Sequence, residues 1–156
     1  MREFQDIGSF MLHLAAMQIA VQHEAEKGLG KAIKIITAAA KAELGHYLEQ
    51  VGPFPAWAPL AESTLKYHES MGVGESPLLV TGGLYASIKD EHQGNEAVSG
   101  TESDIGAYQE FGTRKIPPRP FMGPAAITSQ ERIEAVMGAA GVKGMLYGTG
   151  SSMLPL

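Results

Sequence analysis

The stretch SFMLHLAAMQIAVQHEAEKGLGKAIKIITAAAKAELGHYLEQ, residues 9–50, decides the fold of this chain. Apolar residues recur in it every three or four positions, which is the period of an amphipathic α-helix. Gly28-Leu29-Gly30 interrupts the pattern, and glycine is less favourable than alanine inside a helix by about 1 kcal/mol. The pattern therefore predicts two helices, one over about residues 9–27 and one from Leu29 to about Gln50.

The segment after these helices is rich in proline and has no sustained period. Gly52-Pro53-Phe54-Pro55 ends the second helix, because proline lacks the backbone donor that a helix needs. Residues 53–77 contain four prolines and a glycine-rich piece at 71–76. We expect a long loop here, with one helical turn at about 62–68.

A β-hairpin is expected next. Leu84, Ala86 and Ile88 alternate with Tyr85, Ser87 and Lys89, which is the period of two typical of a strand. Gln93-Gly94-Asn95 forms a turn, and residues 96–101 return as a second strand.

The last part of the chain predicts two more helices. One begins at Asp104 as N-cap and ends at Gly112, and the other has Pro124 at its first position and ends at about Gly138. Residues 116–120 between them are extended or turning. The fold class is therefore α+β, with long N-terminal helices packed on a small, mainly antiparallel sheet and a C-terminal helix. We expect one domain over 1–140 and a glycine-rich tail over 141–156.

Composition limits the class of protein. The chain has 156 residues, 44% of them hydrophobic and 19% charged, which is enough apolar material for a folded core. It contains no cysteine, which excludes disulfides and thiolate chemistry. The net charge of -5 argues against a protein that holds nucleic acid on a basic face. No apolar run suits a membrane span, and residues 1–28 do not resemble a cleaved signal, so we expect a soluble protein.

The residues that suggest catalysis form weak patterns. Ser63 and Lys66 have the S-x-x-K spacing that brings an amine near a hydroxyl. The glycine-rich piece at 72–76 lacks the lysine of a phosphate-binding loop. Histidines and acidic residues are scattered: His13, His23, His46, His68 and His92, and Glu62, Glu69, Asp90, Glu91, Glu102 and Asp104. We therefore expect no cofactor and no metal, and a small hydrolase that uses Ser63 and Lys66, or an unmarked carboxylate pair, is the alternative function.

One cluster combines positive charge with aromatic rings. Arg114, Lys115 and Arg119 are near the aromatic residues Tyr108, Phe111 and Phe121 in the sequence. Such a cluster binds nucleic acid by stacking and charge, or anchors a protein interface. The acidic net charge favours the interface. The candidate contact residues are Tyr108, Phe111, Arg114, Arg119 and Phe121.

Four motifs, in order, resemble the head-tail joining or tail-completion proteins of long-tailed bacteriophages, also called virion morphogenesis proteins. The most specific is Tyr108-Gln109-Glu110-Phe111-Gly112-Thr113 followed by Pro118-Arg119-Pro120-Phe121-Met122-Gly123-Pro124-Ala125. The others are the helical N-terminal third, Trp57-Ala58-Pro59-Leu60 with Thr64, and Pro77-Leu78-Leu79-Val80-Thr81-Gly82-Gly83-Leu84 with Ser87-Ile88. The resemblance covers about residues 29–140, and leaves out the segments before Gly28 and after Ala140.

The resemblance implies a structural virion protein rather than an enzyme. Such a protein forms a ring, expected to be six-fold, between the head connector or adaptor and the tail terminator or tail tube. DNA passes through the ring without sequence-specific binding, and no membrane is involved. The protein is then located at the head-tail junction of the virion, and in the host cytoplasm during assembly.

Arg119 and Phe121 receive different expectations from the residues themselves. Phe121 follows a stiff proline segment and should bury its ring in the subunit. The Arg119 guanidinium suits a carboxylate or a row of backbone carbonyls, and we expect it at a subunit contact. The alternative is that Arg119 pairs inside its own subunit, with Glu110 or Glu131.

Overall fold

The structure is a computed structural model that describes residues 6–148. Its elements, in chain order, are α1 (Ile7–Ala42), α2 (Glu62–Ser70), α3 (Gly83–Ser87), β1 (Ile88–Gln93), β2 (Glu96–Thr101), α4 (Asp104–Phe111), α5 (Met122–Thr128) and α6 (Gln130–Gly148). The fold class is α+β, as predicted. A long N-terminal helix carries a two-stranded antiparallel sheet, and the C-terminal helix packs on α1.

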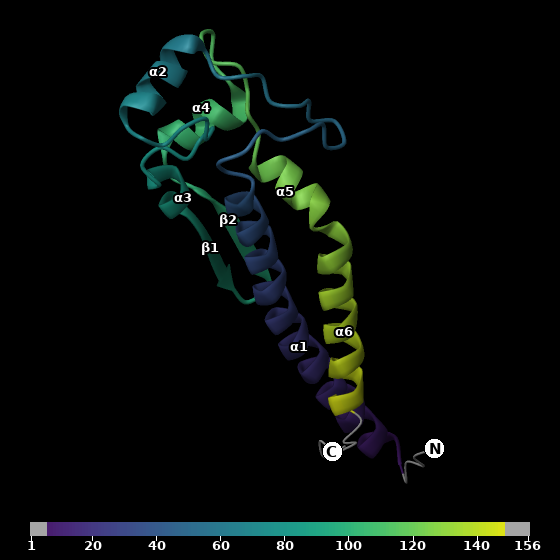
Figure 1. Cartoon of the computed structure of the whole chain (residues 1–156). Helices are drawn as coiled ribbons and strands as arrows, with labels where there is room; N and C mark the ends of the chain where they lie inside the picture. Colours follow the sequence, from purple (N-terminus) through teal and green to yellow (C-terminus); the bar gives the residue numbers. More distant parts are fainter. Residues whose placement is uncertain (1–5, 149–156) are drawn as a thin grey trace, which may run out of the picture.

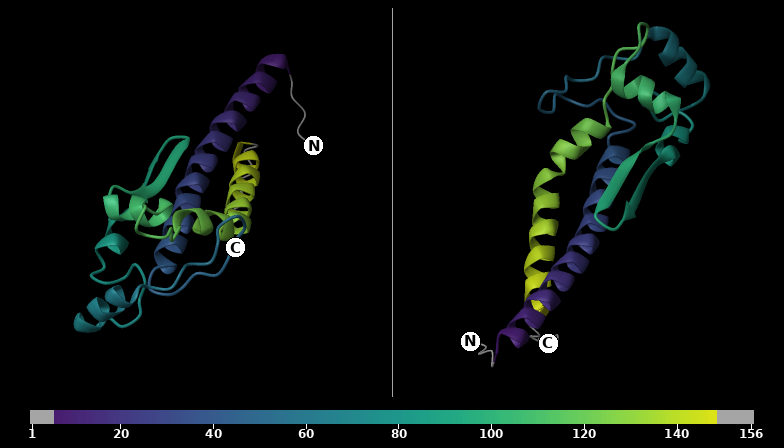
Figure 2. Two further views of the ribbon diagram at one scale, coloured as in Figure 1. Left: turned by 90° about the horizontal axis from the view of Figure 1, so that it is seen from above. Right: turned by 180° about the vertical axis from the view of Figure 1, so that it is seen from behind.

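The molecule is elongated, with a stem and a body (Figure 1). The stem is the antiparallel pair of α1 and α6, and at its far end α1 extends beyond the end of α6, which packs beside Met17. The body is formed by residues 43–121 and gathers at the other end of α1, while the β-hairpin lies along that half of α1 (Figure 2). No helix within residues 6–148 is both long and apolar enough to span a bilayer.

Helix α1 is one continuous helix of 36 residues, so the predicted break at Gly28-Leu29-Gly30 is wrong. Both glycines lie where another element approaches the helix. A Cβ atom at Gly28 would be 2.8 Å from the Cβ of Ala140 in α6, and one at Gly30 would be 3.3 Å from the His92 ring of the hairpin. Close packing against α6 and the hairpin thus outweighs the low helix propensity of glycine.

The C-terminal end of α1 also differs from the prediction. The helix ends at Ala42 rather than near Gln50. Gly45 has a φ of 100°, a conformation that favours glycine, and its N–H donates to the carbonyl of Pro77. The apolar period continues past this turn because Leu44 and Tyr47 pack in the core without being helical.

A seam of small residues holds the stem together. Ala140, Gly144 and Gly148 recur every four residues along one side of α6 and are all buried. A Cβ atom at Gly144 would be 2.5 Å from the Cα of Val21, and one at Gly148 would be 2.4 Å from the Cα of Met17. The seam therefore requires glycine at these two positions.

Helix α6 runs ten residues beyond the predicted end at Gly138, as far as Gly148. Glycines that lowered its helix propensity form part of the seam. The remainder of the predicted tail, residues 149–156, lies outside the described residues. The division into a domain over 1–140 and a tail over 141–156 stays a prediction.

An ion triad also joins the two stem helices. The Glu24 carboxylate accepts hydrogen bonds from Lys27 Nζ of its own helix and from Lys143 Nζ of α6, each at 3.1 Å. These hydrogen bonds, first that of Lys143 and then that of Lys27, lower the pKa of Glu24. Glu24 is only 5% exposed, whereas the side chains of Lys27 and Lys143 are 53% and 49% exposed, so the two lysines cover the carboxylate from the surface.

The sheet is a single hairpin whose second strand and turn are as predicted. Strands β1 and β2 pair in the register Ile88 to Thr101 through Gln93 to Glu96, around a two-residue turn. The predicted first strand is wrong from Leu84 to Ser87, which form the short helix α3. Gly82 precedes this helix with a φ of 76°, and Ser87 Oγ donates to the Leu84 carbonyl, so local turn geometry prevails over alternation.

The remaining helices match the predictions in place and differ at their ends. Helix α2 is longer than the predicted turn, and α4 ends before Gly112 as expected, with Ser103 rather than Asp104 as N-cap. The last predicted helix is divided at Ser129, and Pro124 is the third residue of α5 rather than the first.

The core lies where α1, the hairpin, the body loops and α5 meet. Its buried residues come from segments far apart in the sequence: Ala40, Leu44, Trp57, Ile88, Phe121 and Ala125. Phe121 and Ile88 are fully buried. The core therefore fixes the loop that contains Trp57 against the start of α5.

Candidate functional site

Two proline-rich segments are joined in the body, in what we call the clip. The clip consists of Trp57, Ala58 and Pro59 on one segment and of Arg119 and Pro120 on the other. Trp57 Nε1 donates to the Pro120 carbonyl at 2.9 Å, and Arg119 Nη2 donates to the carbonyls of Ala58 and Pro59, each at 3.0 Å. Arg119 Nε adds a longer bond to the Ala58 carbonyl. Proline-rich chain has few donors of its own, so these two side chains supply them.

The Glu110 carboxylate holds the start of α5. Its Oε2 atom accepts from the backbone N–H groups of Phe121 and Met122, at 2.8 and 3.0 Å, and its Oε1 atom accepts from that of Gly123 at 3.1 Å. These N–H groups have no partner within their helix, and a negative charge is favourable there. The Arg119 N–H donates to the Gln109 carbonyl at 2.6 Å, so α4 and the segment before α5 are joined twice.

A second carboxyl group, that of Glu43, is buried close to Glu110. Glu43 follows the last residue of α1, is 7% exposed, and its Oε2 atom has no hydrogen-bond partner among the described residues. Burial, and to a lesser extent the charge of Glu110, raise the pKa of Glu43 to about 7. Glu43 is buried and Glu110 is half-buried, and neither carboxyl group lines the groove described below.

The five predicted contact residues separate into two groups. Arg119 and Phe121 are buried inside the subunit, at 5% and 0% exposure, although Arg119 also lines the groove described below. A role for these two residues in partner contacts stays a prediction. The expectation that Phe121 buries its ring is confirmed. Arg119 does pair inside its own subunit, with backbone carbonyls rather than with Glu110 or Glu131.

The other three candidates are exposed on α4 and just after it. Tyr108 is 50% exposed, Phe111 is 81% exposed, and Arg114 lies at the surface. These residues form one edge of the body, and a role for them in partner contacts stays a prediction.

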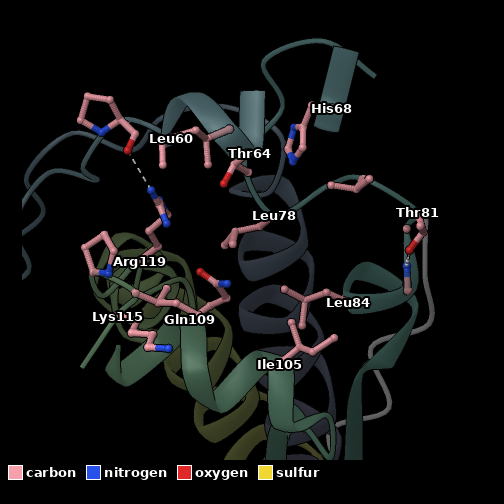
Figure 3. Close-up of a pocket in the computed structure, with 17 residues that line it drawn as sticks. Leu60, Thr64, His68, Leu78, Thr81, Leu84, Ile105, Gln109, Lys115 and Arg119 are labelled. Atoms are coloured by element: carbon pink, nitrogen blue, oxygen red, sulfur yellow. Dashed lines mark hydrogen bonds between the residues drawn. The ribbon is translucent and has the colours of Figure 1, made fainter. Parts of the chain in front are cut away.

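A groove of about 440 Å³ opens beside this edge, between α2, α4 and residues 78–84 (Figure 3). Most of its lining is apolar, and the Gln109 amide points into it between Leu78 and Arg119. The Gln109 Oε1 atom is buried and has no hydrogen-bond partner among the described residues. Leu78 has a φ of 63°, the one positive value outside glycine in residues 6–148. Such backbone strain is often found where a surface has a function.

The residues of the alternative enzyme do not form a catalytic arrangement. Ser63 and Lys66 are exposed on successive turns of α2, and no hydrogen bond joins them in the described part of the chain. His68 is buried, and its Nδ1 atom is 3.2 Å from the Gly74 carbonyl. Among residues 6–148 no group of three or more histidine and acidic side chains could hold a metal ion.

Sequence reasoning missed the roles of Trp57, Glu110 and Glu43. Glu110 and Trp57 stand inside the motifs quoted above, yet only the fold shows that one caps α5 and the other reaches Pro120. The signal for Glu110 was an acidic residue eleven positions before Phe121, an N-cap residue whose own side chain cannot cap a helix. Nothing in the sequence indicates that Glu43 is buried.

The chain is similar to a protein named "Mu-like prophage FluMu G protein 1" from Haemophilus influenzae. The two sequences are 32% identical over 78 residues, which is 49% of this chain and 53% of that protein. The chain therefore matches about half the length of this relative. No family model matches the chain, and no solved structure matches it.

Proposed function

We propose that this chain is a structural protein of a bacteriophage virion, which forms a ring at the head-tail junction through which DNA passes. The similarity to a Mu-like prophage protein carries the phage assignment. The motifs that resemble the head-tail joining family support the finer role in the neck. The ring, expected to be six-fold, joins the head connector or adaptor to the tail terminator or tail tube.

The contacts of the motif residues support a positioning role. Trp57, Glu110 and Arg119 use their polar groups to hold the chain's own backbone. None of them presents a nucleophile beside a base, which enzymatic hydrolysis would require. We propose that the protein is not an enzyme, and that its motifs build a rigid body that neighbouring virion proteins contact.

The net charge of the chain agrees with passage of DNA. A surplus of five negative charges repels phosphates, so DNA slides past such a subunit more easily than past a basic one. The location is then the virion, with the host cytoplasm as the place of assembly.

Mass spectrometry of purified particles of the parent phage tests this function. The chain is expected in a few to a dozen copies per virion, and antibody labelling should place it at the head-tail junction. Clean virions without the chain would contradict a structural role.

A matched pair of variants tests the enzyme alternative. Ser63→Ala and Lys66→Ala should leave the number of infectious particles near normal, because both residues are exposed on α2. A loss of infectivity by a variant that folds normally would favour the hydrolase.

A further inference from the structure

The outer face of α1 carries exposed apolar residues far from the body. Leu12, Ala15 and Ile19, which we call the α1 ridge, lie on one side of the helix, with Leu12 75% and Ile19 70% exposed. At about 100° per residue, Ile19 is on the side of α1 opposite Gly28 and thus opposite α6. Residues 7–20 contain no aspartate, glutamate, lysine or arginine. The polar side chains in this stretch are Ser9, His13 and Gln18, so the exposed surface here is largely apolar. A helix with so few polar side chains is typically covered by a partner.

The same face of α1 is covered nearer the body. The β-hairpin lies there, where His92 packs on Gly30 and Ser99 Oγ is 2.7 Å from Thr37 Oγ1. Gly30 precedes Thr37 by seven residues and follows Ile19 by eleven, and both spacings return to nearly the same side of a helix. The α1 ridge therefore continues a covered face past the end of the hairpin (Figure 1).

Helix α6 has an exposed apolar side of its own. Ala135, Val142 and Met145, which we call the α6 ridge, face away from the seam, with Val142 60% and Met145 55% exposed. Val142 is about 160° around the helix from Ala140 and Gly144, which contact α1. The two ridges consequently lie on opposite outer sides of the stem.

The exposed area suits two contacts for each subunit. The chain exposes 10716 Å², whereas a compact monomer of its mass exposes about 7,600 Å². Each residue outside 6–148 is assigned an accessible area of about 160 Å², the value for an extended chain, and this area is subtracted. The accessible area that remains for residues 6–148 is still larger than that of a compact chain of the same length by about 1,500 Å². A standard interface takes about 800 Å² from each partner, so the excess equals about two such patches.

We infer that the α1 ridge of one subunit binds the α6 ridge of a second copy of this chain. A symmetric dimer would bury one ridge twice and leave the other exposed, whereas a head-to-tail contact buries both and repeats around a ring. Helix α6 of the second copy then covers the α1 ridge, on the part of that face that the hairpin does not reach. The inference rests on the proposed ring and names the surface that forms it.

Site-directed cross-linking tests the contact, because the natural chain has no cysteine. Ile19→Cys and Val142→Cys are made in separate full-length chains of different tag length, which are mixed at about 100 µM and treated with a short bismaleimide. We expect a mixed dimer from these two variants, and little product from either variant alone. Val98→Cys, equally exposed at 68% but on the hairpin, is the control and should not cross-link to either.

Three results would overturn the inference: no mixed dimer, an Ile19→Cys dimer with itself, or equal product from the Val98→Cys control. A Leu12→Glu/Ile19→Glu chain gives a second measurement, since these exposed positions can change without unfolding the subunit. It should sediment as a monomer, with an unchanged melt, under conditions in which the natural chain forms oligomers. Binding of the natural chain to anionic vesicles without any mixed dimer would assign the ridges to lipid instead. If the chain is present in virions but the mixed dimer is absent, the proposed function is retained and the inferred contact between the two ridges is rejected.

Discussion

At the scale of single residues, Arg119 has the clearest structural role. Its guanidinium satisfies two carbonyls of a proline-rich loop, and its own N–H donates to α4. Arg119→Ala should lower the free energy of unfolding by about 3 kcal/mol, because the two carbonyls lose their charged donor inside the body. Urea denaturation of the purified chain measures this loss.

Arg114→Ala is the matched control for Arg119→Ala. Arg114 is exposed five residues earlier, and its removal should change the free energy of unfolding by less than about 0.5 kcal/mol. Equal melting temperatures for the two variants would show that the clip is not what stabilises the body.

Glu43 should make stability depend on pH. Its pKa is raised from 4.5 to about 7, so between these values the unfolded chain is ionised while the folded chain keeps the proton. The contribution of Glu43 to the free energy of unfolding is therefore fully present below pH 4.5. It decreases as the pH rises to about 7, by up to about 3 kcal/mol in total. Glu43→Gln removes the ionisable group and should remove this loss.

Denaturation of both proteins at pH 5 and pH 8 tests the role of Glu43. The Glu43→Gln variant should be close to the natural chain at pH 5 and more stable by about 2 kcal/mol at pH 8. Glu24, whose pKa is lowered, acts in the opposite sense in acid but is common to both proteins and cancels in the difference. A difference that does not change with pH would contradict the buried position of Glu43.

At the scale of elements, the glycines of α6 differ in their surroundings. A methyl group at Gly144 would meet the backbone of Val21, whereas one at Gly141 meets nothing within 4 Å. Gly144→Ala should separate the stem helices and lower the melting temperature by several degrees. Gly141→Ala should raise stability by up to about 1 kcal/mol, since alanine favours the helix. Circular dichroism melts compare the two variants, and similar effects of both would argue against a close-packed seam.

The same glycines explain which helix boundaries the sequence could predict. Period and capping signals located α2 and α4, because those signals are local, whereas α3 was predicted as a strand. The continuity of α1 through Gly28 and the extension of α6 to Gly148 depend on contacts between residues more than a hundred positions apart. A local rule counts such glycines as helix breakers, and only the packed partner shows that they permit close approach.

The hairpin and the candidate site also show that local sequence signals do not predict tertiary contacts. The turn at Gly94 and the second strand were predictable from turn chemistry, whereas α3 replaced a strand although Leu84 to Ser87 alternate. Charge and aromatic content identified the segment around Arg119, but not its burial. An arginine among prolines suits a partner's carbonyls as well as those of its own loop, and the choice is made by the tertiary fold.

At the scale of the whole molecule, the protection of backbone amides from hydrogen exchange should decrease along α1 from the body to the far end of the stem. Residues 32–40 of α1 pack in the core or next to the hairpin, whereas residues 7–20 lie at the far end of the stem, where the last residue of α6, Gly148, packs on Met17. Amide hydrogen exchange in dilute protein should therefore be slow over 32–40 and faster over 7–20, since local opening is easier where few contacts are lost.

Assembly should reduce this difference in hydrogen exchange between the two parts of α1. If a second copy covers the α1 ridge, residues 7–20 gain protection at high protein concentration, while residues 32–40 change little. The Leu12→Glu/Ile19→Glu chain serves as the control, because it should show fast exchange over 7–20 at every concentration. Uniform exchange along α1 in the dilute natural chain would contradict the division into body and stem.

The position of Trp57 gives the molecule an optical reporter. It is the sole tryptophan of the sequence, its indole is 5% exposed, and it lies in the clip, far from both ridges. Its fluorescence should therefore emit at short wavelength in the folded chain, shift to the red when the body opens, and keep its colour when subunits associate through their stems. Emission wavelength recorded beside light scattering would thus follow unfolding and ring formation as two separate signals from one unlabelled sample.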